Sequence, residues 1–338
     1  MMKKHLSKKL LIPGFLGLIA AAVFMGFIFD TTQPVHGHSE TALIDIPRGY
    51  RFVEIVDLLH REGVIRNRAF FFLLALSRGA AHHMRAGEYE FPENMSPLEV
   101  LNKLVKGDIK RYRVVIREDL TVREIADCLS RFGLINRKKF DALSRDSDFL
   151  ASLGIEGETI EGYLYPETYF FDRSMGARQI MIRMVNEFWR HITPAMRNRA
   201  QALDMTLHEA ITLASIIGKE TGYGEEKKLV SAVFHNRLKK GMRLQSDPTA
   251  VYHLKDFNGP IKRRHLALAS SHNTYRINGL PPGPIANPGI DSLQAALYPT
   301  PANYLYFVSK NNGTHFFSTN YASHNQAVRK YQVNGKKE

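Results

Sequence analysis

The sequence predicts an α+β fold in which one membrane-spanning helix precedes two folded regions. Three observations predict it: an uncharged stretch near the N-terminus, an internal duplication, and short strand and helix patterns that alternate along the chain. The chain has 338 residues, 44% of them hydrophobic, which is enough for two domains with cores of their own.

The uncharged stretch covers the twenty residues 10–29 and predicts a transmembrane anchor. As a helix it would be about 30 Å long, which matches the hydrocarbon core of a bilayer. Four lysines precede it and Asp30 follows, so the positive-inside rule places residues 1–9 in the cytoplasm and exports the rest. A cleaved signal peptide is the alternative, because Ala20–Ala22 are small, but the apolar run continues for seven residues beyond them.

A polar segment, residues 30–43, then predicts a linker into the first folded region. His36 and His38 lie in it and could be metal ligands, although we expect a solvated tether. The net charge of +13 suits an anionic polymer or a membrane surface. No stacked-aromatic RNA signature or zinc-finger spacing accompanies this charge, which argues against nucleic acid. Cys128 is the one cysteine, which excludes an intrachain disulfide but not an extracytoplasmic location.

The duplication aligns residues 46–70 with residues 116–140 at an offset of seventy, with nine identities in twenty-five positions. Each copy predicts a strand end, a polar turn, a helix stopped by Gly63 or Gly133, and an extended piece that leads to another helix. This order is typical of small polysaccharide-binding modules. A duplicated scaffold without a ligand is the alternative.

Between and after the copies the patterns predict further short elements. Residues 85–91 alternate like a strand, and Ser96–Gly107 has the cap, the proline and the terminal glycine of a helix. Amphipathic helices are expected over residues 177–189 and 225–240, and a strand over residues 304–310. We expect small mixed sheets rather than one long parallel sheet.

Residues 206–224 predict the helix that carries the most informative side chain, Glu220. Thr206 and Glu209 form a capping-box pattern at its start, and Gly222 and Gly224 predict its end. Glu220 follows three apolar residues at helical spacing and so shares one side of the helix with Leu213, Ile216 and Ile217.

This position predicts a raised pKa for Glu220. The negative end of the helix dipole and the apolar neighbours both disfavour an ionised carboxylate, as a general acid at neutral pH requires. The alternative is that the helix is rotated slightly and Glu220 forms a surface ion pair with Lys219 or Lys227.

The segments around this helix contain the other candidate side chains. Residues 160–171 contain five aromatic side chains, which could line a sugar site or form the edge of a core with satisfied hydroxyl groups. Loops rich in turn residues follow, with candidate substrate-binding residues Gln245, Asp247, Asn273 and Tyr275. Residues 235–237, at the end of the second amphipathic helix, could brace a site or cap the helix. We expect no metal, because no HxxxH pair has a nearby glutamate and no thiolate set exists, and we expect no cofactor.

Four motifs resemble, in order and spacing, those of the endolytic murein transglycosylases, the YceG-like family: LASIIGKET, VFHNRLKKGMRLQSDPT, NTYRINGLPPGPIANPG and HFFSTNYASHN. The resemblance covers nearly the whole chain. It implies a membrane helix at residues 10–29, a small LysM-like α/β module at residues 44–108, and a larger mixed α+β catalytic domain at residues 109–338 that begins with the second copy of the module.

The resemblance also implies a bacterial inner-membrane enzyme, single-pass with its C-terminal domain outside the cytoplasm. It would cleave the glycan strands of nascent peptidoglycan internally, terminate them, and leave 1,6-anhydro-muramyl ends. The catalytic glutamate of the family corresponds to Glu220. Members usually have Glu where this chain has Gly218, and we expect that earlier carboxylate to be auxiliary because Gly218 lies off the apolar side of the helix. An altered activity of this protein is the alternative. Penicillin-binding peptidoglycan synthases are the partners that the resemblance suggests.

The expected chemistry needs one carboxylate, whereas ordinary glycosidases need two. Glu220 would protonate the glycosidic oxygen and then accept the proton of the C6 hydroxyl as the anhydro ring closes. Asp247 is a candidate second carboxylate, so a hydrolytic muramidase is one alternative. A non-catalytic glycan-binding scaffold tethered to the membrane is another.

Overall fold

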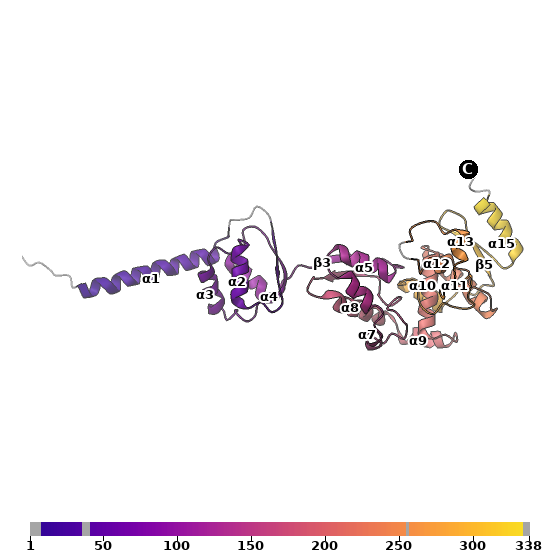
Figure 1. The fold of residues 1–338 in the computed structure, drawn as a ribbon, viewed down its shortest axis with the longest axis horizontal. Helices are drawn as coiled ribbons and strands as arrows, with labels where there is room; N and C mark the ends of the chain where they lie inside the picture. The colour runs from indigo at the N-terminus through magenta and orange to yellow at the C-terminus, as the bar shows by residue number, and fades with distance from the viewer. Residues whose placement is uncertain (1–7, 36–40, 255–256, 334–338) are drawn as a thin grey trace, which may run out of the picture. The chain divides into compact units, whose positions relative to one another are not determined.

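The computed structural model of the protein describes residues 8–35, 41–254 and 257–333, drawn in Figure 1. It divides into two compact units, Met1–Tyr112 with Asp172–Ser174, and Arg113–Phe171 with Met175–Glu338. Most of the predicted cytoplasmic tail lies outside the described residues. So do residues 36–40 of the predicted linker, with His36 and His38.

The predicted anchor lies within one helix, α1 (Lys8–Thr32), of which Pro13–Thr32 is long and apolar enough to cross a membrane. By length and composition it could equally be a signal sequence. The helix continues beyond the predicted end at residue 29, into the predicted linker. The hydroxyl groups of Thr31 and Thr32 donate to the carbonyls of Phe27 and Ile28 at 2.7 and 2.6 Å, which extends the helix through two polar residues.

The first unit packs three helices against a two-stranded antiparallel sheet. Its elements after α1 are β1 (Ala42–Ile46), α2 (Phe52–Arg61), α3 (Arg68–Ser77), β2 (Gly87–Phe91) and α4 (Pro97–Lys106). Its buried side chains come from both strands and from α2, α3 and α4, and they form one continuous core that includes Leu59, Phe71 and Tyr89.

The caps of α4 confirm the local signals. The Ser96 hydroxyl accepts the N–H of Glu99, the Glu99 carboxylate accepts the N–H of Ser96, and Gly107 takes the left-handed conformation that ends the helix at φ 69°.

The second unit begins with the second copy of the duplication. Its first elements are β3 (Tyr112–Val115), α5 (Val122–Arg131), α6 (Arg137–Leu143), α7 (Ser147–Ser152), β4 (Thr168–Phe171), α8 (Gly176–His191) and α9 (Pro194–Gln201). Both copies consist of a helix, a glycine and a second helix, with Gly63 and Gly133 at φ 73° and 65°. This confirms the predicted order of elements.

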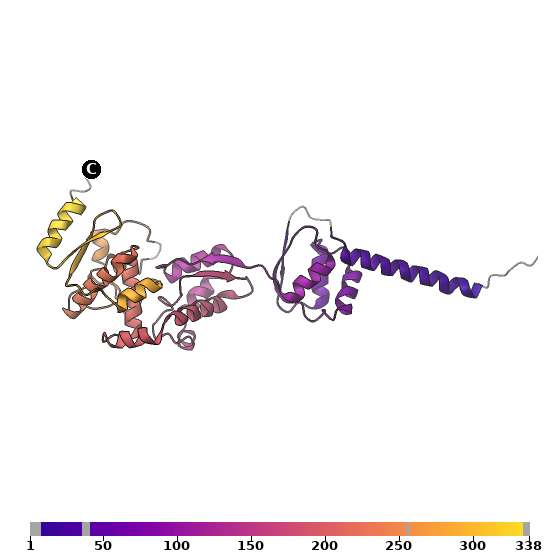
Figure 2. The same ribbon diagram turned by 180° about the vertical axis from the view of Figure 1, so that it is seen from behind.

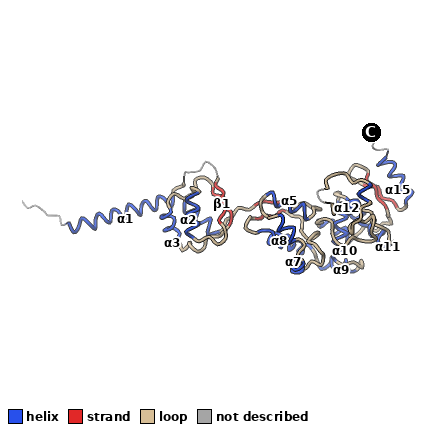
Figure 3. The backbone as a smooth tube through the Cα atoms, viewed as in Figure 1, coloured by secondary structure: helices blue, strands red, loops and turns tan. Residues whose placement is uncertain are grey.

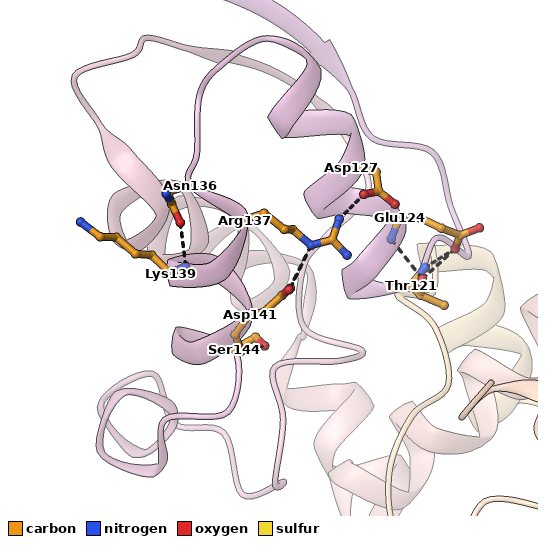
Figure 4. A network of polar contacts seen from close by, with 8 residues as sticks. All are labelled: Thr121, Glu124, Asp127, Asn136, Arg137, Lys139, Asp141 and Ser144. Atoms are coloured by element: carbon orange, nitrogen blue, oxygen red, sulfur yellow. Dashed lines mark hydrogen bonds and ion pairs between the residues drawn. The ribbon is translucent and has the colours of Figure 1, made fainter. Parts of the chain in front are cut away.

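Polar side chains join the two helices of the second copy (Figure 4). The Arg137 guanidinium lies between Asp127 on α5 and Asp141 on its own helix, 3.1 Å from the latter. Thr121 and Glu124 form the capping box that starts α5. These ion pairs lie at the surface, where such pairs contribute little to stability, and they join α5 to α6 without showing whether the module binds a ligand.

The remainder of the second unit surrounds one central helix, α10 (Leu207–Glu220), as Figures 1 and 2 show. The later elements are α11 (Gly224–Lys239), α12 (Asp247–Val251), α13 (Arg263–Leu266), α14 (Ile290–Leu297), β5 (Tyr306–Ser309), β6 (His315–Ser318), α15 (Tyr321–Val328) and the π-helical turn η1 (Arg329–Val333). Because α9, α11, α12 and α14 all contact α10, it is buried on every side from Ala210 to Gly218. The sequence predicted one apolar side only.

The strands are short and few among the described residues, as Figure 3 shows. They form two-stranded sheets, β1–β2, β3–β4 and β5–β6. The α+β class is confirmed. The two sheets with a described register are antiparallel, whereas we expected mixed sheets.

The aromatic segment at residues 160–171 belongs largely to the core. Tyr163, Tyr165, Tyr169 and Phe171 are buried, and only Phe170 is exposed. The Tyr163 hydroxyl lies 2.8 Å from Nδ1 of His208, and the Tyr169 hydroxyl donates to the carbonyl of Tyr165 at 2.7 Å. Of the two alternatives, the core edge with satisfied hydroxyl groups is the one observed.

Candidate active site

Glu220 is the last residue of α10, so the helix ends earlier than predicted. Thr221 is extended at φ −143°, and its hydroxyl accepts the N–H of Tyr223 at 3.1 Å, which turns the chain. Gly224 does not stop α10 but is the first residue of α11. The carboxyl of Glu220 therefore lies at the negative end of a buried helix.

Among the described residues, one side chain forms a hydrogen bond with the Glu220 carboxyl. The Ser246 hydroxyl donates a hydrogen bond to Oε1 of Glu220. The alternative ion pairs with lysine are not formed, because Lys219 donates to the carbonyl of Asp119 at 3.1 Å and Lys227 lies 3.3 Å from Glu118. Glu220 thus faces a neutral donor rather than a cation at contact distance.

Burial raises the pKa of Glu220 to about 7. The Ser246 hydrogen bond lowers it, the charge of Asp247 raises it, and the charge of Arg237 lowers it. The desolvation of the carboxyl is the largest of these causes. A carboxylic acid with this pKa is protonated in a large share of molecules at neutral pH and can give up that proton, as a general acid must.

Ser246 is held in place by a buried cluster of hydroxyl groups. Its N–H donates to Oγ1 of Thr274 at 2.9 Å, and its carbonyl accepts the hydroxyl of Thr249 at 2.6 Å. Oγ1 of Thr249 and Oγ1 of Thr274 lie 2.8 Å apart. Since Ser246 and both threonines are buried, the direction of the Ser246 hydroxyl is set by the protein and not by solvent.

Arg237 is a buried cation whose charge acts on Glu220. Its side chain is buried, and it donates to the carbonyl of Leu305 at 2.7 Å and of Leu244 at 2.7 Å. Its guanidinium lies over the ring of Tyr306, 5.3 Å from the centroid. With His235 and Asn236, which bind the carbonyls of Ala296 and Ala302 at 2.7 Å, it braces the surrounding loops.

Two of the four candidate substrate-binding residues contact each other. The hydroxyl of Tyr275 donates to Oδ1 of Asp247, the first residue of α12. Burial and the Asp247 carboxylate raise the pKa of Tyr275, so its hydroxyl keeps its proton. Asp247 itself is exposed and lies next in the chain to Ser246, which places the pair beside Glu220.

The other two candidates lie in different settings. Gln245 is exposed, and its backbone is left-handed at φ 52°, which aims the chain into α12. Asn273 is fully buried, and its amide donates to the carbonyls of Leu266 and Leu268 at 3.1 and 2.6 Å. Oδ1 of Asn273 also accepts the N–H of Tyr275 at 3.0 Å, so Asn273 shapes the loop that presents Tyr275.

Asp119, which no sequence motif indicated, packs against Gly218. A Cβ atom at position 218 would lie 1.9 Å from Oδ1 of Asp119. Burial raises the pKa of Asp119 to about 6, and Oδ1 has no hydrogen-bond partner among the described residues. No local signal could have found this contact, because it joins residues far apart in the chain. Gly218 lies off the Leu213 side, as expected, but it is buried.

Two pockets lie elsewhere on the second unit. One of about 600 Å³ is formed by β4 and α8, with Arg183 and Glu187 in its lining. The other pocket, of about 460 Å³, is lined by residues that include His191, Lys228 and Tyr298. Neither lining contains Glu220, so the candidate site rests on the contacts of the carboxyl and not on these pockets. Among the residues that the structure describes, no group of His, Cys, Asp and Glu side chains could hold a metal ion.

The chain is similar to known proteins over most of its length. The sequence profile of the YceG-like family matches residues 44–330. The chain is 29% identical to the endolytic murein transglycosylase of Bacillus subtilis, over 88% of this chain and 87% of that protein. It is 25% identical to the endolytic murein transglycosylase of Streptococcus pneumoniae, over 95% of this chain but 64% of that longer protein.

A solved structure has the same fold. The crystal structure of a putative YceG-like protein from Listeria monocytogenes superimposes with a TM-score of 0.60 and 32% sequence identity. The match covers 86% of this chain and 99% of that one.

Proposed function

The chain belongs to the YceG-like family, and on that premise we propose that it is a membrane-anchored endolytic lytic transglycosylase of peptidoglycan, with Glu220 as its single general acid and base. The observation that carries the proposal is the carboxyl of Glu220 at the end of a buried helix, with a pKa raised to about 7 and one fixed neutral donor, Ser246. The names of the relatives from Bacillus subtilis and Streptococcus pneumoniae support the same reaction.

The reaction cleaves the bond between C1 of N-acetylmuramic acid and O4 of N-acetylglucosamine. Glu220 gives its proton to O4 as the C1–O4 bond breaks, and the N-acetyl group helps to stabilise the oxocarbenium-like state. The resulting carboxylate then takes the proton of the C6 hydroxyl as O6 bonds to C1. Atoms balance without water, and Glu220 ends protonated as it began.

Ser246 and Arg237 stabilise the ionised form of Glu220, which exists between the two proton transfers. Once Glu220 has lost its proton, its carboxylate accepts the Ser246 hydroxyl, and a hydrogen bond to a charged acceptor is stronger than one to a neutral acid. The buried charge of Arg237 also lowers the energy of the carboxylate. Both effects limit the cost of ionising a buried group and still leave it able to take the second proton.

We place the sugar beside Tyr275 and Asp247, whose hydrogen-bonded pair lies next to Ser246. Exposed Gln245 offers an amide to sugar hydroxyl groups, and Asn273 holds the loop of Tyr275 in place. The family's earlier carboxylate, replaced here by Gly218, is auxiliary in this scheme.

The proposal includes a location and partners. Helix α1 anchors the chain in the bacterial inner membrane, with residues 1–9 in the cytoplasm and the residues that follow the helix outside it. The module at residues 44–108 is LysM-like and contacts glycan, and cleavage terminates nascent strands. Peptidoglycan synthases of the penicillin-binding class are the partners, and residues 109–338 form the catalytic domain.

Mass spectrometry of digested peptidoglycan tests the proposal. The full chain in detergent is expected to release fragments that end in 1,6-anhydro-muramic acid, and Glu220→Gln is expected to lose at least about 100-fold in rate, the lower range for general acid catalysis. Glu225→Gln, an exposed carboxylate on α11, is the matched control and is expected to retain activity.

Three outcomes would overturn parts of the proposal. Anhydro products from Glu220→Gln at the wild-type rate would remove Glu220 from its role. Products one water heavier, with free reducing ends that disappear in Asp247→Asn, would identify a hydrolytic muramidase that uses both carboxylates. Binding of glycan without any product from the wild type would support the scaffold alternative.

A further inference from the structure

A second buried carboxylate, Glu161, takes no part in the proposed mechanism. It lies in the turn between α7 and β4, and its residue is 3% exposed. Oε1 accepts the N–H of Val122 at 2.9 Å and Nδ2 of Asn287 at 2.8 Å, while Oε2 accepts the hydroxyl of Tyr252 at 3.1 Å. One side chain thus joins three segments of the second unit that are far apart in the chain.

Through Asn287, Glu161 is connected to the helix that carries the catalytic acid. Oδ1 of Asn287 accepts the N–H groups of Gly162 and Leu164 at 3.0 and 2.9 Å, which ties the turn of Glu161 to the loop of Asn287. Two residues earlier in that loop, Ile285 donates its N–H to the hydroxyl of Ser215 at 3.0 Å.

Ser215 lies within α10 and is fully buried. Its own hydroxyl donates to the carbonyl of Thr212 in the same helix at 2.7 Å, so its oxygen is fixed on both sides. The loop of Asn287 is therefore fastened to the helix that ends at Glu220.

Through Tyr252, Glu161 is connected to the donor of that acid. Tyr252 directly follows α12 (Asp247–Val251), the short helix that Ser246 precedes as its N-cap residue. A hydrogen bond to Tyr252 holds the C-terminal end of α12, and the cluster of Thr249 and Thr274 holds its start. Because the helix is short, its two ends move together.

We propose that Glu161 is a positioning residue for the transglycosylase reaction: it holds α10 and α12 to one buried point and thereby fixes the Ser246 to Glu220 hydrogen bond. The inference rests on the proposed function of Glu220. Misplacing a catalytic group by about 1 Å can cost on the order of 100-fold in rate, so an anchor shared by the acid and its donor affects the chemical step rather than substrate binding.

The contacts also determine which substitution preserves the anchor. Burial raises the pKa of Glu161 to about 8. The hydrogen bonds from Val122 and Tyr252 lower this pKa. The charge of Glu124 raises it, and the charge of Lys219 lowers it. The group is therefore mostly neutral at pH 7, and Gln is its isostere. The Gln amide oxygen accepts from Val122 and Asn287, and its NH₂ donates to the Tyr252 oxygen.

The experiment compares Glu161→Gln, Glu161→Leu and Tyr252→Phe in the full chain, with kcat, KM and the pH profile of kcat/KM as readouts. Glu161→Gln is expected to behave as wild type. The other two are expected to lower kcat by about 10- to 100-fold with KM little changed. They are also expected to move the basic limb to higher pH, because a lost Ser246 bond raises the pKa of Glu220.

A double variant separates positioning from general destabilisation. In a Ser246→Ala background the bond to Glu220 is already absent, so Tyr252→Phe is expected to move the basic limb no further. If Tyr252→Phe shifts the limb equally in both backgrounds, or leaves kcat and the limb of the folded enzyme at wild-type values, the proposal is wrong. If Glu161→Leu does not fold, the comparison of Tyr252→Phe with the wild type still tests the proposal.

The inference can fail separately from the proposed function. If the wild type is active and Tyr252→Phe has unchanged kinetics, the positioning role of Glu161 is refuted and the proposed function is not. If wild type releases no product, a titration of Glu220 followed by ¹³C-glutamate NMR, assigned with Glu220→Gln, makes the same comparison without turnover. An unchanged Glu220 titration in Tyr252→Phe then refutes the inference.

Discussion

The pKa of Glu220 is set by opposing neighbours, and removing two of them should move it in opposite directions. Ser246→Ala deletes a donor that stabilises the carboxylate, so the pKa rises. Asp247→Asn deletes a negative charge that disfavours the carboxylate, so the pKa falls. The two residues are adjacent in the chain, which makes the variants a matched pair.

The magnitude follows from the hydrogen bond. A hydrogen bond to a charged group contributes about 1.5–3 kcal/mol, and one pKa unit corresponds to about 1.4 kcal/mol. Glu220 is only half-buried as a residue, so the lower end applies and Ser246→Ala should raise the pKa by about 1 unit from its value of about 7. Because Asp247 ranks below Ser246 among the causes, Asp247→Asn should produce a smaller, downward shift.

The assay is the pH dependence of kcat/KM on purified glycan strands, with anhydro ends counted by mass spectrometry. A general acid is active in its protonated form, so activity falls as pH rises through the pKa of Glu220, and the basic limb reports that pKa. Ser246→Ala should therefore retain activity to higher pH than wild type, and Asp247→Asn should lose it at lower pH. If the basic limbs of the two variants move in the same direction, or if both stay at the wild-type pH, the assignment of Glu220 as the acid is wrong.

Three further predictions concern stability. Gly218→Ala should lose about 1–3 kcal/mol in urea unfolding, since its Cβ would overlap Asp119, and Asp119→Gly should restore most of it in the double variant; additive losses would contradict the contact. Because the folded-state pKa of Glu161 is raised from 4.5 to about 8, its contribution to stability is complete below pH 4.5 and is lost as pH rises to about 8. Thermal melts of Glu161→Gln should show a smaller loss than those of wild type, because the raised pKa values of Glu220 and Asp119 still contribute; parallel curves would argue against it. Ser96→Ala should destabilise the first unit by about 1 kcal/mol in chemical denaturation and leave the kcat of strand cleavage unchanged, so a lower kcat would link the cap to catalysis.

Local signals predicted most of the helices. Thr206 with Glu209 starts α10 and Gly107 ends α4 as expected, because capping hydrogen bonds join residues three or four positions apart. The repeat of helix, glycine and helix was found for the same reason, since Gly63 and Gly133 alone determine where the first helix of each copy ends. Gly224 was misread as a stop because a glycine marks a turn without showing on which side of it a helix lies.

The surroundings of Glu220 could not be predicted from such signals. Ser246 lies 26 residues from Glu220, and Asn287 lies 126 residues from Glu161. Periodicity places Glu220 on a helix side but cannot tell whether that side, or every side, is covered. The catalytic role of Glu220 and the sugar contacts of Gln245, Asp247, Asn273 and Tyr275 remain predictions. The structure identifies the residues that contact Glu220, which the sequence did not indicate.

The end of α1 has a consequence for how the folded part of the first unit is held against this helix. The ring of Phe27 packs edge-on against Phe70 of α3 at 5.8 Å, so the end of α1 packs directly on α3. Leu73 and Leu76, on that same short apolar helix, are exposed. If α1 crosses the bilayer, these leucines lie at the depth of the lipid headgroups. The helices and strands of the first unit that follow α1 would then rest on the membrane surface.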